Sequence, residues 1–266
     1  MPVFCANLSF LFHEAPFPER FALAARAGFR GVEYLFPYDW PAAQVREWLD
    51  ANRLVQVLHN LPAGDWAAGE RGLACLPGRE GEFQDSVALA LDYARTLGCR
   101  RLNCLAGIPP AGSDPDRVRG TLLANLRFAA HEAQAAGVRL LVEPINSRRD
   151  MPGFWLDRSA KAEALIAEVA PAPLGLQYDL YHMQVMEGDL APTLERLMPL
   201  IGHMQFADTP GRHQPGTGEL RFDYLFEQVD ALGYRGWIGA EYRPLAGTDA
   251  SLDWFARWRD REPPTD

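Results

Sequence analysis

The chain of 266 residues contains a single lysine, Lys161, among its 26 basic residues. Lys161 lies in residues 159–165, a segment with the pattern of a helix whose lysine points to solvent. A lysine that forms a Schiff base must be desolvated in a pocket. The scarcity of lysine therefore argues against Schiff-base chemistry.

Cysteine is also scarce, and the four thiols at Cys5, Cys75, Cys99 and Cys104 have neither CxxC nor zinc-ribbon spacing. We expect reduced thiols and a cytoplasmic protein. The N-terminus lacks a basic region followed by a long apolar stretch, so no signal peptide is expected. No run of about 18 apolar residues occurs, so no membrane span is expected.

Positive charge is in deficit, because the formal net charge is -9 and the sequence pI is about 5.2. A protein that binds nucleic acid usually presents a basic surface. The charge balance therefore argues against a nucleic-acid partner. A small anionic substrate remains compatible with it, because a few local arginines can outweigh the overall charge.

Short apolar segments alternate with amphipathic segments along the chain. The apolar segments begin near residues 3, 31, 55, 101, 139, 174, 201 and 237, and eight helical segments follow them, the last at 249–259. Such alternation predicts a parallel sheet covered by helices. Eight units favour a closed (β/α)8 TIM barrel, an α/β fold, and no GxGxxG motif supports a dinucleotide-binding fold.

The barrel is expected to form one domain over residues 1–260, followed by a C-terminal tail at 261–266. A long loop at about 61–78 interrupts the alternation and contains Trp66. Loops of this length inside compact domains are often functional. We expect the loop to be ordered, either as a lid over the substrate or as an interface with a second subunit.

The last four predicted strands each carry an oxygen-bearing side chain at or near the carboxyl end. These side chains are Glu143, Asp179, Gln205 and Glu241. The carboxyl ends of barrel strands converge at the face where active sites lie. Three carboxylates and one amide are hard ligands, so the pattern predicts a divalent metal, Mg²⁺ or Mn²⁺.

Two alternatives to a metal site stay open at this point. Any one strand-end carboxylate can be a structural ion pair with an arginine. The carboxylates can also share protons without a metal, as coupled dyads do.

Several motifs resemble the hydroxypyruvate isomerase family within the xylose-isomerase-like barrels. They are residues 59–72 (HNLPAGDWAAGERG), 143–146 (EPIN), 177–184 (QYDLYHMQ) and 215–219 (PGTGE). The resemblance covers nearly the whole chain. It implies interconversion of hydroxypyruvate and 2-hydroxy-3-oxopropanoate (tartronate semialdehyde) through an enediolate. Close relatives isomerise 2-oxo-tetronates instead, and a ketose 3-epimerase is a further alternative on the same site.

The resemblance also implies site residues. Glu143 and Glu241 are the expected acid/base pair, and His182 is an expected substrate contact. Related sugar epimerases carry a histidine where Gln205 stands, so weaker metal binding is expected here.

Two further residues are predicted to bind substrate from their position. Arg212, just after the seventh strand, is the first candidate to bind the substrate carboxylate, because guanidinium pairs bidentately with carboxylates. His59 ends the third strand and is expected to face the same mouth.

Two readings from other classes compete with an isomerase. A metal-dependent nuclease on this barrel would need more histidine ligands and a basic surface. A non-catalytic barrel that binds a sugar acid would not need carboxylates at both Glu143 and Glu241. The expected partner is therefore a small sugar-acid substrate, and a homo-oligomer is possible.

Overall fold

The structure is a computed structural model that describes residues 2–259 and 261–264. The strands are β1 (Val3–Asn7), β2 (Gly31–Tyr34), β3 (Val55–Asn60), β4 (Arg101–Cys104), β5 (Arg139–Val142), β6 (Leu174–Asp179), β7 (Ile201–Phe206) and β8 (Trp237–Ala240). The helices are α1 (Phe17–Ala27), α2 (Ala42–Asn52), α3 (Glu80–Leu97), α4 (Pro115–Ala135), α5 (Ser159–Val169), α6 (Leu180–Met186), α7 (Leu190–Leu197), α8 (Phe222–Ala231) and the short 3-10 helices η1 (Asp249–Ser251) and η2 (Asp253–Arg257).

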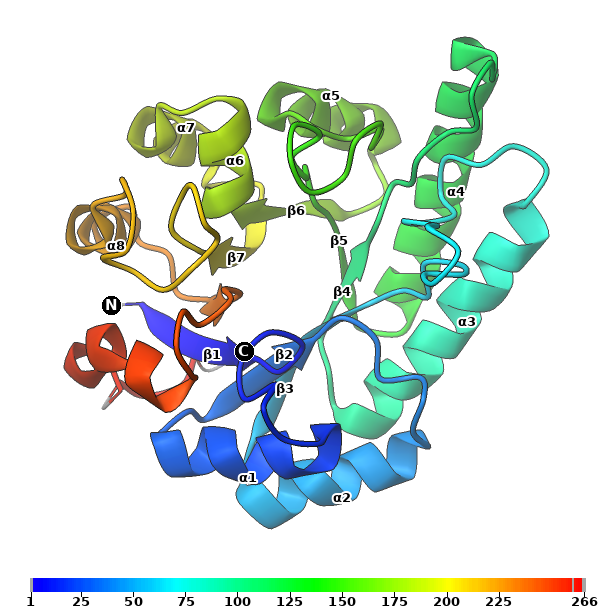
Figure 1. Ribbon diagram of the computed structural model, residues 1–266. Coiled ribbons are helices and arrows are strands. Elements are labelled where there is room, and N and C mark those ends of the chain that lie inside the picture. Colours follow the sequence, from blue (N-terminus) through cyan, green and yellow to red (C-terminus); the bar gives the residue numbers. More distant parts are fainter. Residues whose placement is uncertain (1, 260, 265–266) are drawn as a thin grey trace.

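The eight strands are parallel and close into a barrel in chain order. β1 pairs with β8 to complete the closure, with Val3 opposite Trp237 and Ala6 opposite Ala240. Helices surround the strands on the outside (Figure 1). The predicted (β/α)8 barrel is confirmed.

The helices form where the sequence supplies a cap and an apolar stripe. In α4, Asp114 accepts a hydrogen bond from the Asp116 backbone N–H, which satisfies a free donor at the helix start. Pro115 occupies the first turn, where its missing N–H costs nothing. The buried face then repeats every three or four residues, as in Leu122, Leu126 and Ala129, so α4 packs against the barrel.

The prediction for the last helix was wrong about its type. Residues 249–259 were expected to form one α-helix, whereas the structure has η1 and η2 separated at Leu252. Side chains take backbone groups that a continuous helix would use. Tyr242 donates its hydroxyl to the Ser251 carbonyl, and Ser251 donates its own hydroxyl to the Thr248 carbonyl.

The region after β6 also differs from the prediction, because it contains two helices, α6 and α7, instead of one.

Glycine makes room for large groups inside the barrel. A Cβ at Gly31 would lie 2.7 Å from the Trp237 ring, and a Cβ at Gly239 would lie 2.2 Å from the Glu33 carboxylate. Both positions are therefore confined to glycine by close approach. The space at Gly239 allows a carboxylate to lie within the barrel.

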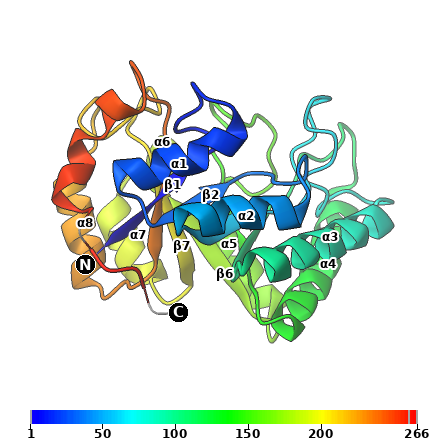
Figure 2. The ribbon, with the colours of Figure 1, turned by 90° about the horizontal axis from the view of Figure 1, so that it is seen from below.

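The long loop after β3 is tied to the barrel by backbone hydrogen bonds. Gly72 donates to the Ala63 carbonyl at 3.0 Å, and Cys75 donates to the Ala106 carbonyl at 2.8 Å. The loops that follow β1 and β3 rise on the same side of the barrel (Figure 2). The loop is thus an ordered part of the strand-end face.

Two sequence expectations concern boundaries and membranes. The predicted barrel limits, 1–260, and the predicted tail, 261–266, include residues 1, 260, 265 and 266, which lie outside the described residues. These limits stay predictions. In the described part of the chain, no helix has both the length and the apolar character needed to cross a bilayer.

Candidate active site

A cavity of about 260 Å³, here called the mouth cavity, opens at the carboxyl ends of the strands. The charged or titratable side chains that line it are Arg71, Glu143, Asp150, His182, Arg212, Glu241 and Arg243. Trp66 of the long loop and Phe10 of the loop after β1 add apolar walls. Four residues predicted from the sequence, Glu143, His182, Arg212 and Glu241, therefore line one cavity.

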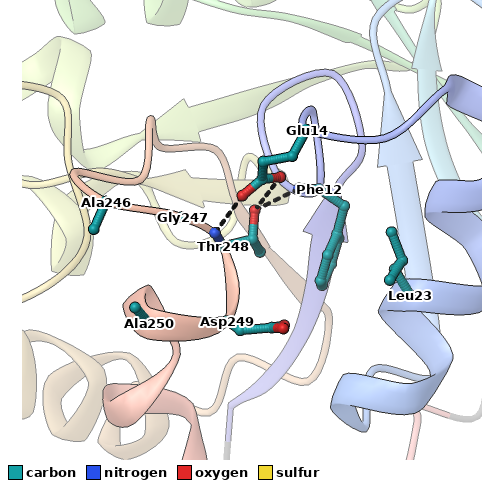
Figure 3. Close-up of a pocket in the computed structure, with 8 residues that line it drawn as sticks. All are labelled: Phe12, Glu14, Leu23, Ala246, Gly247, Thr248, Asp249 and Ala250. Carbon is teal, nitrogen blue, oxygen red and sulfur yellow. Dashed lines mark hydrogen bonds between the residues drawn. The ribbon is translucent and has the colours of Figure 1, made fainter.

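A larger cavity of about 490 Å³ lies elsewhere, between residues 12–23 and residues 246–250. Figure 3 shows that its Glu14 carboxylate turns onto Thr248. Glu14 accepts hydrogen bonds there from the Thr248 backbone N–H at 2.5 Å and the Thr248 hydroxyl at 3.0 Å. The other side chains include Phe12, Leu23 and Asp249, without a converging set of titratable groups. The mouth cavity is therefore the candidate active site.

Glu143 follows β5 and is held by amides of the two neighbouring strands. Its Oε2 accepts hydrogen bonds from Asn103 Nδ2 at 2.8 Å and Gln177 Nε2 at 2.9 Å. Burial raises the pKa of Glu143 well above its usual value, and the charges of Glu241 and Asp179 raise it further. Glu143 is thus oriented, and its proton is retained more readily than in water.

Glu241 follows β8 and is held in a similar way. Its Oε2 accepts hydrogen bonds from Asn7 Nδ2 at 2.9 Å and Gln205 Nε2 at 2.6 Å. Its Oε1 forms an ion pair with Arg212 Nη2. Burial raises the pKa of Glu241, while Arg212 opposes the shift by favouring the ionised form.

Asp179 ends β6 and caps α6. Its Oδ1 accepts a hydrogen bond from the Tyr181 backbone N–H at 2.8 Å. Its Oδ2 is fully buried and, among the described residues, has no hydrogen-bond partner. Burial raises the pKa of Asp179. A buried carboxylate oxygen without a donor is costly, so this atom indicates a place for a cation, a proton or a substrate donor.

His182 lies in α6 beside two of the carboxylates. Its Nε2 is 3.5 Å from Asp179 Oδ2 and 3.8 Å from Glu143 Oε1. Ligand atoms of these three residues lie within 4.8 Å of one another, so the cluster has the dimensions of a metal site. Burial lowers the pKa of His182 well below its usual value, and the charge of Arg212 adds to the effect, so the ring is neutral.

The hydrogen bonds of Asn146 determine which ring nitrogen of His182 carries the proton. Asn146 Oδ1 accepts from the backbone N–H groups of Arg149 and Asp150, so its amide nitrogen must face His182 Nδ1, at 2.7 Å. Nδ1 is then an acceptor, and the proton of the neutral ring lies on Nε2. His182 therefore presents a donor to the cavity, which suits a substrate oxygen better than a metal ion.

Arg212 lies between the acids and two aromatic rings. Its guanidinium carbon is 4.7 Å from the centroid of the Phe10 ring and 5.1 Å from that of Tyr181. Its Nη2 pairs with Glu241, and its Nη1 lies 3.3 Å from Asp150 Oδ2. Its Nε is buried without a partner among the described residues. Arg212 is thus largely neutralised by protein carboxylates and keeps one free donor.

Comparison with known proteins places this geometry in a family. Residues 21–258 match the xylose isomerase-like TIM barrel family. A 2-oxo-tetronate isomerase of Cupriavidus necator is 53% identical over 261 residues, which cover 98% of this chain and 100% of the relative. A hydroxypyruvate isomerase of Escherichia coli is 50% identical over 256 residues, which cover 96% and 99% of the two chains.

The chain belongs to the xylose isomerase-like TIM barrel family. The predicted resemblance to its hydroxypyruvate isomerase members is confirmed, and so is the prediction of an isomerase. A crystal structure from Brucella melitensis described as AP endonuclease, family 2, is also similar, with a TM-score of 0.95 at 47% identity over 98% of this chain and 100% of that one.

Gln205, which was predicted as a metal ligand, forms hydrogen bonds with three neighbouring side chains. Its Oε1 accepts a hydrogen bond from Gln177 Nε2 at 2.6 Å, and its Nε2 donates to Glu241 and to Glu33. Two carboxylates demand a donor, so the amide nitrogen must face them. Gln205 therefore orients Glu241, and its predicted role as a metal ligand stays a prediction.

The position of His59 contradicts the predicted substrate contact. β3 contains a bulge, because Val32 pairs with Gln56 and Glu33 pairs with Leu58. The extra residue shifts the alternation of side chains by one. The His59 ring therefore packs beside Tyr38, with ring centroids 6.1 Å apart, and does not line the mouth cavity. Burial lowers its pKa to about 4.

The sequence analysis missed several residues that line or support the site. Gln177 precedes Asp179 by two residues on the same strand, a spacing that could have indicated a shared face. Arg71 and Asp150 lie in loops, where no periodicity marks their direction. Glu33 is the next-to-last residue of β2, the position that Gln205 has in β7, but the sequence analysis did not include it.

Proposed function

We propose that this isomerase interconverts hydroxypyruvate and 2-hydroxy-3-oxopropanoate through an enediolate. The observation that carries the proposal is a pair of buried carboxylates, Glu143 and Glu241, with raised pKa values at one small cavity. Carboxyl groups whose pKa values approach neutrality can both accept and donate a proton. The relatives named above support the same chemistry.

The reaction moves one hydrogen between adjacent carbons. A base takes a proton from C3 of hydroxypyruvate, and the electron pair forms the enediolate. An acid then delivers a proton to C2, while the hydroxyl proton passes from the C3 oxygen to the C2 oxygen. Arg212 favours ionised Glu241, so we assign Glu241 as the base and Glu143 as the acid in this direction.

Two donors are suited to the negative charge that develops on the enediolate oxygens. His182 presents Nε2–H beside Glu143 and Asp179. Arg212 presents a buried Nε–H that has no hydrogen-bond partner among the described residues. Donors fixed before the reaction stabilise developing charge without reorganisation. Trp66 lines the same cavity and helps to exclude water.

A divalent cation, Mg²⁺ or Mn²⁺, fits part of the predicted ligand set. Glu143 and the unpartnered Asp179 Oδ2 are the residues that would hold it, because Mg²⁺ sites often use one or two carboxylates together with water and substrate oxygens. Both Glu241 oxygens and the Gln205 oxygen already have protein partners. When bound, the ion would polarise the substrate carbonyl.

A 2-oxo-tetronate is the second candidate substrate. The Cupriavidus necator relative that bears this name is 53% identical to the chain. A 2-oxo-tetronate carries the same 2-oxo acid group with one more carbon, so the same carboxylates can serve it. For location and assembly we keep the sequence-based proposals of a cytoplasmic protein and a homo-oligomer.

Purified protein assayed on hydroxypyruvate and on a 2-oxo-tetronate in deuterated buffer tests the proposal. We expect conversion of at least one acid with deuterium incorporated at the carbon that receives the proton. Loss of activity with chelator and recovery with Mg²⁺ or Mn²⁺ would support the cation, whereas unchanged activity would leave the carboxylates acting alone. No conversion and no exchange with either acid would refute the function.

A further inference from the structure

A second arginine, Arg71, faces the mouth cavity from the long loop. We propose that Arg71, stacked on Trp66, binds the carboxylate of the substrate. The proposal rests on the proposed function, because it specifies how a small 2-oxo acid is distinguished from a neutral sugar. The role first predicted for Arg212, binding the substrate carboxylate, thus passes to Arg71, which forms no ion pair with another described residue.

Arg71 is held in a fixed orientation by its own loop. Its guanidinium carbon lies 4.1 Å from the centroid of the Trp66 ring. Its Nη1 donates hydrogen bonds to the carbonyls of Trp66 at 3.0 Å and Glu70 at 2.7 Å. These contacts occupy one terminal nitrogen. Nη2 and Nε have no hydrogen-bond acceptor among the described residues, and together they form the fork that a carboxylate binds.

The neighbouring acid does not cancel the charge of Arg71. Glu70 pairs instead with Arg79, whose Nη2 lies 3.1 Å from Glu70 Oε2. The Asp65 backbone N–H donates to the same oxygen at 2.6 Å. Glu70 is therefore satisfied by Arg79 and the Asp65 backbone, and the Arg71 charge remains available to a ligand.

The loop that carries Arg71 is a rigid support. A Cβ at Gly72 would lie 2.2 Å from the Leu105 carbonyl oxygen, so the chain is pressed against the segment after β4 immediately beyond Arg71. Trp66 is fixed in turn by Phe36, with ring centroids 5.1 Å apart. A preformed site loses less conformational entropy on binding, so a single guanidinium can contribute substantially.

The charge balance of the cavity favours Arg71 over the other two arginines. Arg212 is paired with Glu241 and Asp150. Arg243 also lines the cavity, but its side chain is exposed to solvent, where an ion pair contributes little. Arg71 is half-buried and stacked, so its interaction with an anion is less screened.

The test compares an acid with its neutral counterpart. Dihydroxyacetone has the carbon chain of hydroxypyruvate with CH2OH in place of the carboxylate. For Arg71→Ala we expect KM for hydroxypyruvate to rise about 10- to 100-fold. We expect kcat to stay within about threefold, and turnover of dihydroxyacetone to be equally little affected. Arg71→Lys should recover part of the loss, because it restores the charge without the fork.

Arg95→Ala is the control, since Arg95 is an exposed arginine of α3 that pairs with Asp92 and is not among the described residues that line the mouth cavity. Its KM for hydroxypyruvate should stay within about twofold of wild type. An unchanged KM in Arg71→Ala overturns the proposal. So does a loss of equal size on hydroxypyruvate and dihydroxyacetone, which would indicate a loop that has lost its shape.

Binding of glycerate, a non-reacting acid, measured by calorimetry separates this proposal from the proposed function. If wild type binds glycerate but turns over neither hydroxypyruvate nor a 2-oxo-tetronate, the isomerase function is refuted. Weaker glycerate binding in Arg71→Ala than in wild type would still support the carboxylate site. Turnover of hydroxypyruvate with equal glycerate binding in wild type and Arg71→Ala would refute the carboxylate site alone. If wild type neither binds glycerate nor turns over hydroxypyruvate, both proposals fail.

Discussion

Two groups of buried titratable side chains lie within the barrel, and the pKa values of their carboxylates shift in opposite directions. The interior cluster consists of Cys5, Glu33 and His203. The mouth carboxylates are those of Glu143, Asp179 and Glu241. Glu33 and Asp179 are both 0% exposed, so burial alone does not separate the two groups. The two groups differ instead in the number of hydrogen-bond donors around each carboxylate.

Glu33 has a full set of donors. His203 Nε2 lies 2.6 Å from its Oε2, and Cys5 Sγ donates to the same oxygen at 3.3 Å. Gln205 and Asn7 donate to its Oε1 at 2.7 and 3.0 Å. Burial opposes ionisation, but the His203 charge and these hydrogen bonds hold the pKa of Glu33 below its usual value.

Of the mouth carboxylates, only Glu241 pairs with an arginine within the described part of the chain, and Asp179 Oδ2 has no hydrogen-bond donor there. Their pKa values are raised. Complete pairing makes a buried carboxylate structural, whereas incomplete pairing keeps it ready to exchange protons or bind a ligand. This contrast supports a catalytic role for the mouth carboxylates and a stabilising role for the interior cluster.

The largest expected effect comes from breaking the interior cluster. Glu33→Gln leaves His203 without its buried partner, and removal of one member of a buried pair typically costs about 3–5 kcal/mol. We expect a loss of this size in the free energy of unfolding, measured by urea denaturation. Glu227→Gln, on an exposed face of α8, is the control and should change stability by less than about 0.5 kcal/mol. A loss below about 1 kcal/mol in Glu33→Gln would mean that the interior pairing is unimportant.

The sequence could predict the mouth better than the interior. Glu143 and Glu241 each follow an apolar strand directly, and Asp179 ends one, so strand-end position identified all three. Glu33 lies within a strand of four residues, and its donor His203 is 170 residues away. The contact between Glu33 and His203 forms only when the barrel closes, so no local sequence pattern predicts it.

Two contacts that the sequence did not predict have local physical causes. His59 was assigned to the mouth because it lies at the end of β3, whereas a bulge that the sequence does not reveal turns its side chain the other way. Gln205 was read as an oxygen ligand because position specifies a side chain but not which end of an amide faces inward. The surrounding carboxylates decide that orientation.

The second expected effect is on turnover at the mouth. Glu143→Gln and Glu241→Gln keep the shape of the side chains but remove a group that exchanges protons. General acid-base catalysis typically contributes about 100-fold or more, so kcat should fall by at least that factor. Steady-state kinetics measures this fall in kcat, with whichever of the two acids the isomerase assay shows to be the substrate. Rates close to wild type in both variants would exclude these residues from the mechanism and erase the contrast with the interior.

The third prediction uses the opposite pKa shifts, measured as unfolding free energy against pH in the presence of chelator. The raised pKa of Glu143 means that the folded state binds more protons, so wild-type stability falls as pH rises above about 4.5, the ordinary value. Glu143→Gln should therefore gain stability relative to wild type as pH rises above about 4.5.

Glu33 should behave in the opposite way. Its lowered pKa provides stability that is present above the unfolded value of 4.5 and is lost as pH falls through the folded value. The deficit of Glu33→Gln should therefore be full at neutral pH and should shrink in acid. Parallel stability curves for wild type and both variants would show that the two groups do not differ electrostatically.

The smallest expected effect concerns Asn7, whose Nδ2 donates to both Glu33 at 3.0 Å and Glu241 at 2.9 Å. Asn103 is a matched control, because its Nδ2 donates to Glu143 at 2.8 Å and does not contact Glu33. Each hydrogen bond to a charged group contributes about 1.5–3 kcal/mol, but Gln205 remains to hold both of the acids bonded to Asn7. Asn7→Ala should therefore lower kcat by about tenfold and also lower unfolding free energy by about 1 kcal/mol more than Asn103→Ala does. Equal stability losses in the two variants would show that the interior and the mouth are not joined through Asn7.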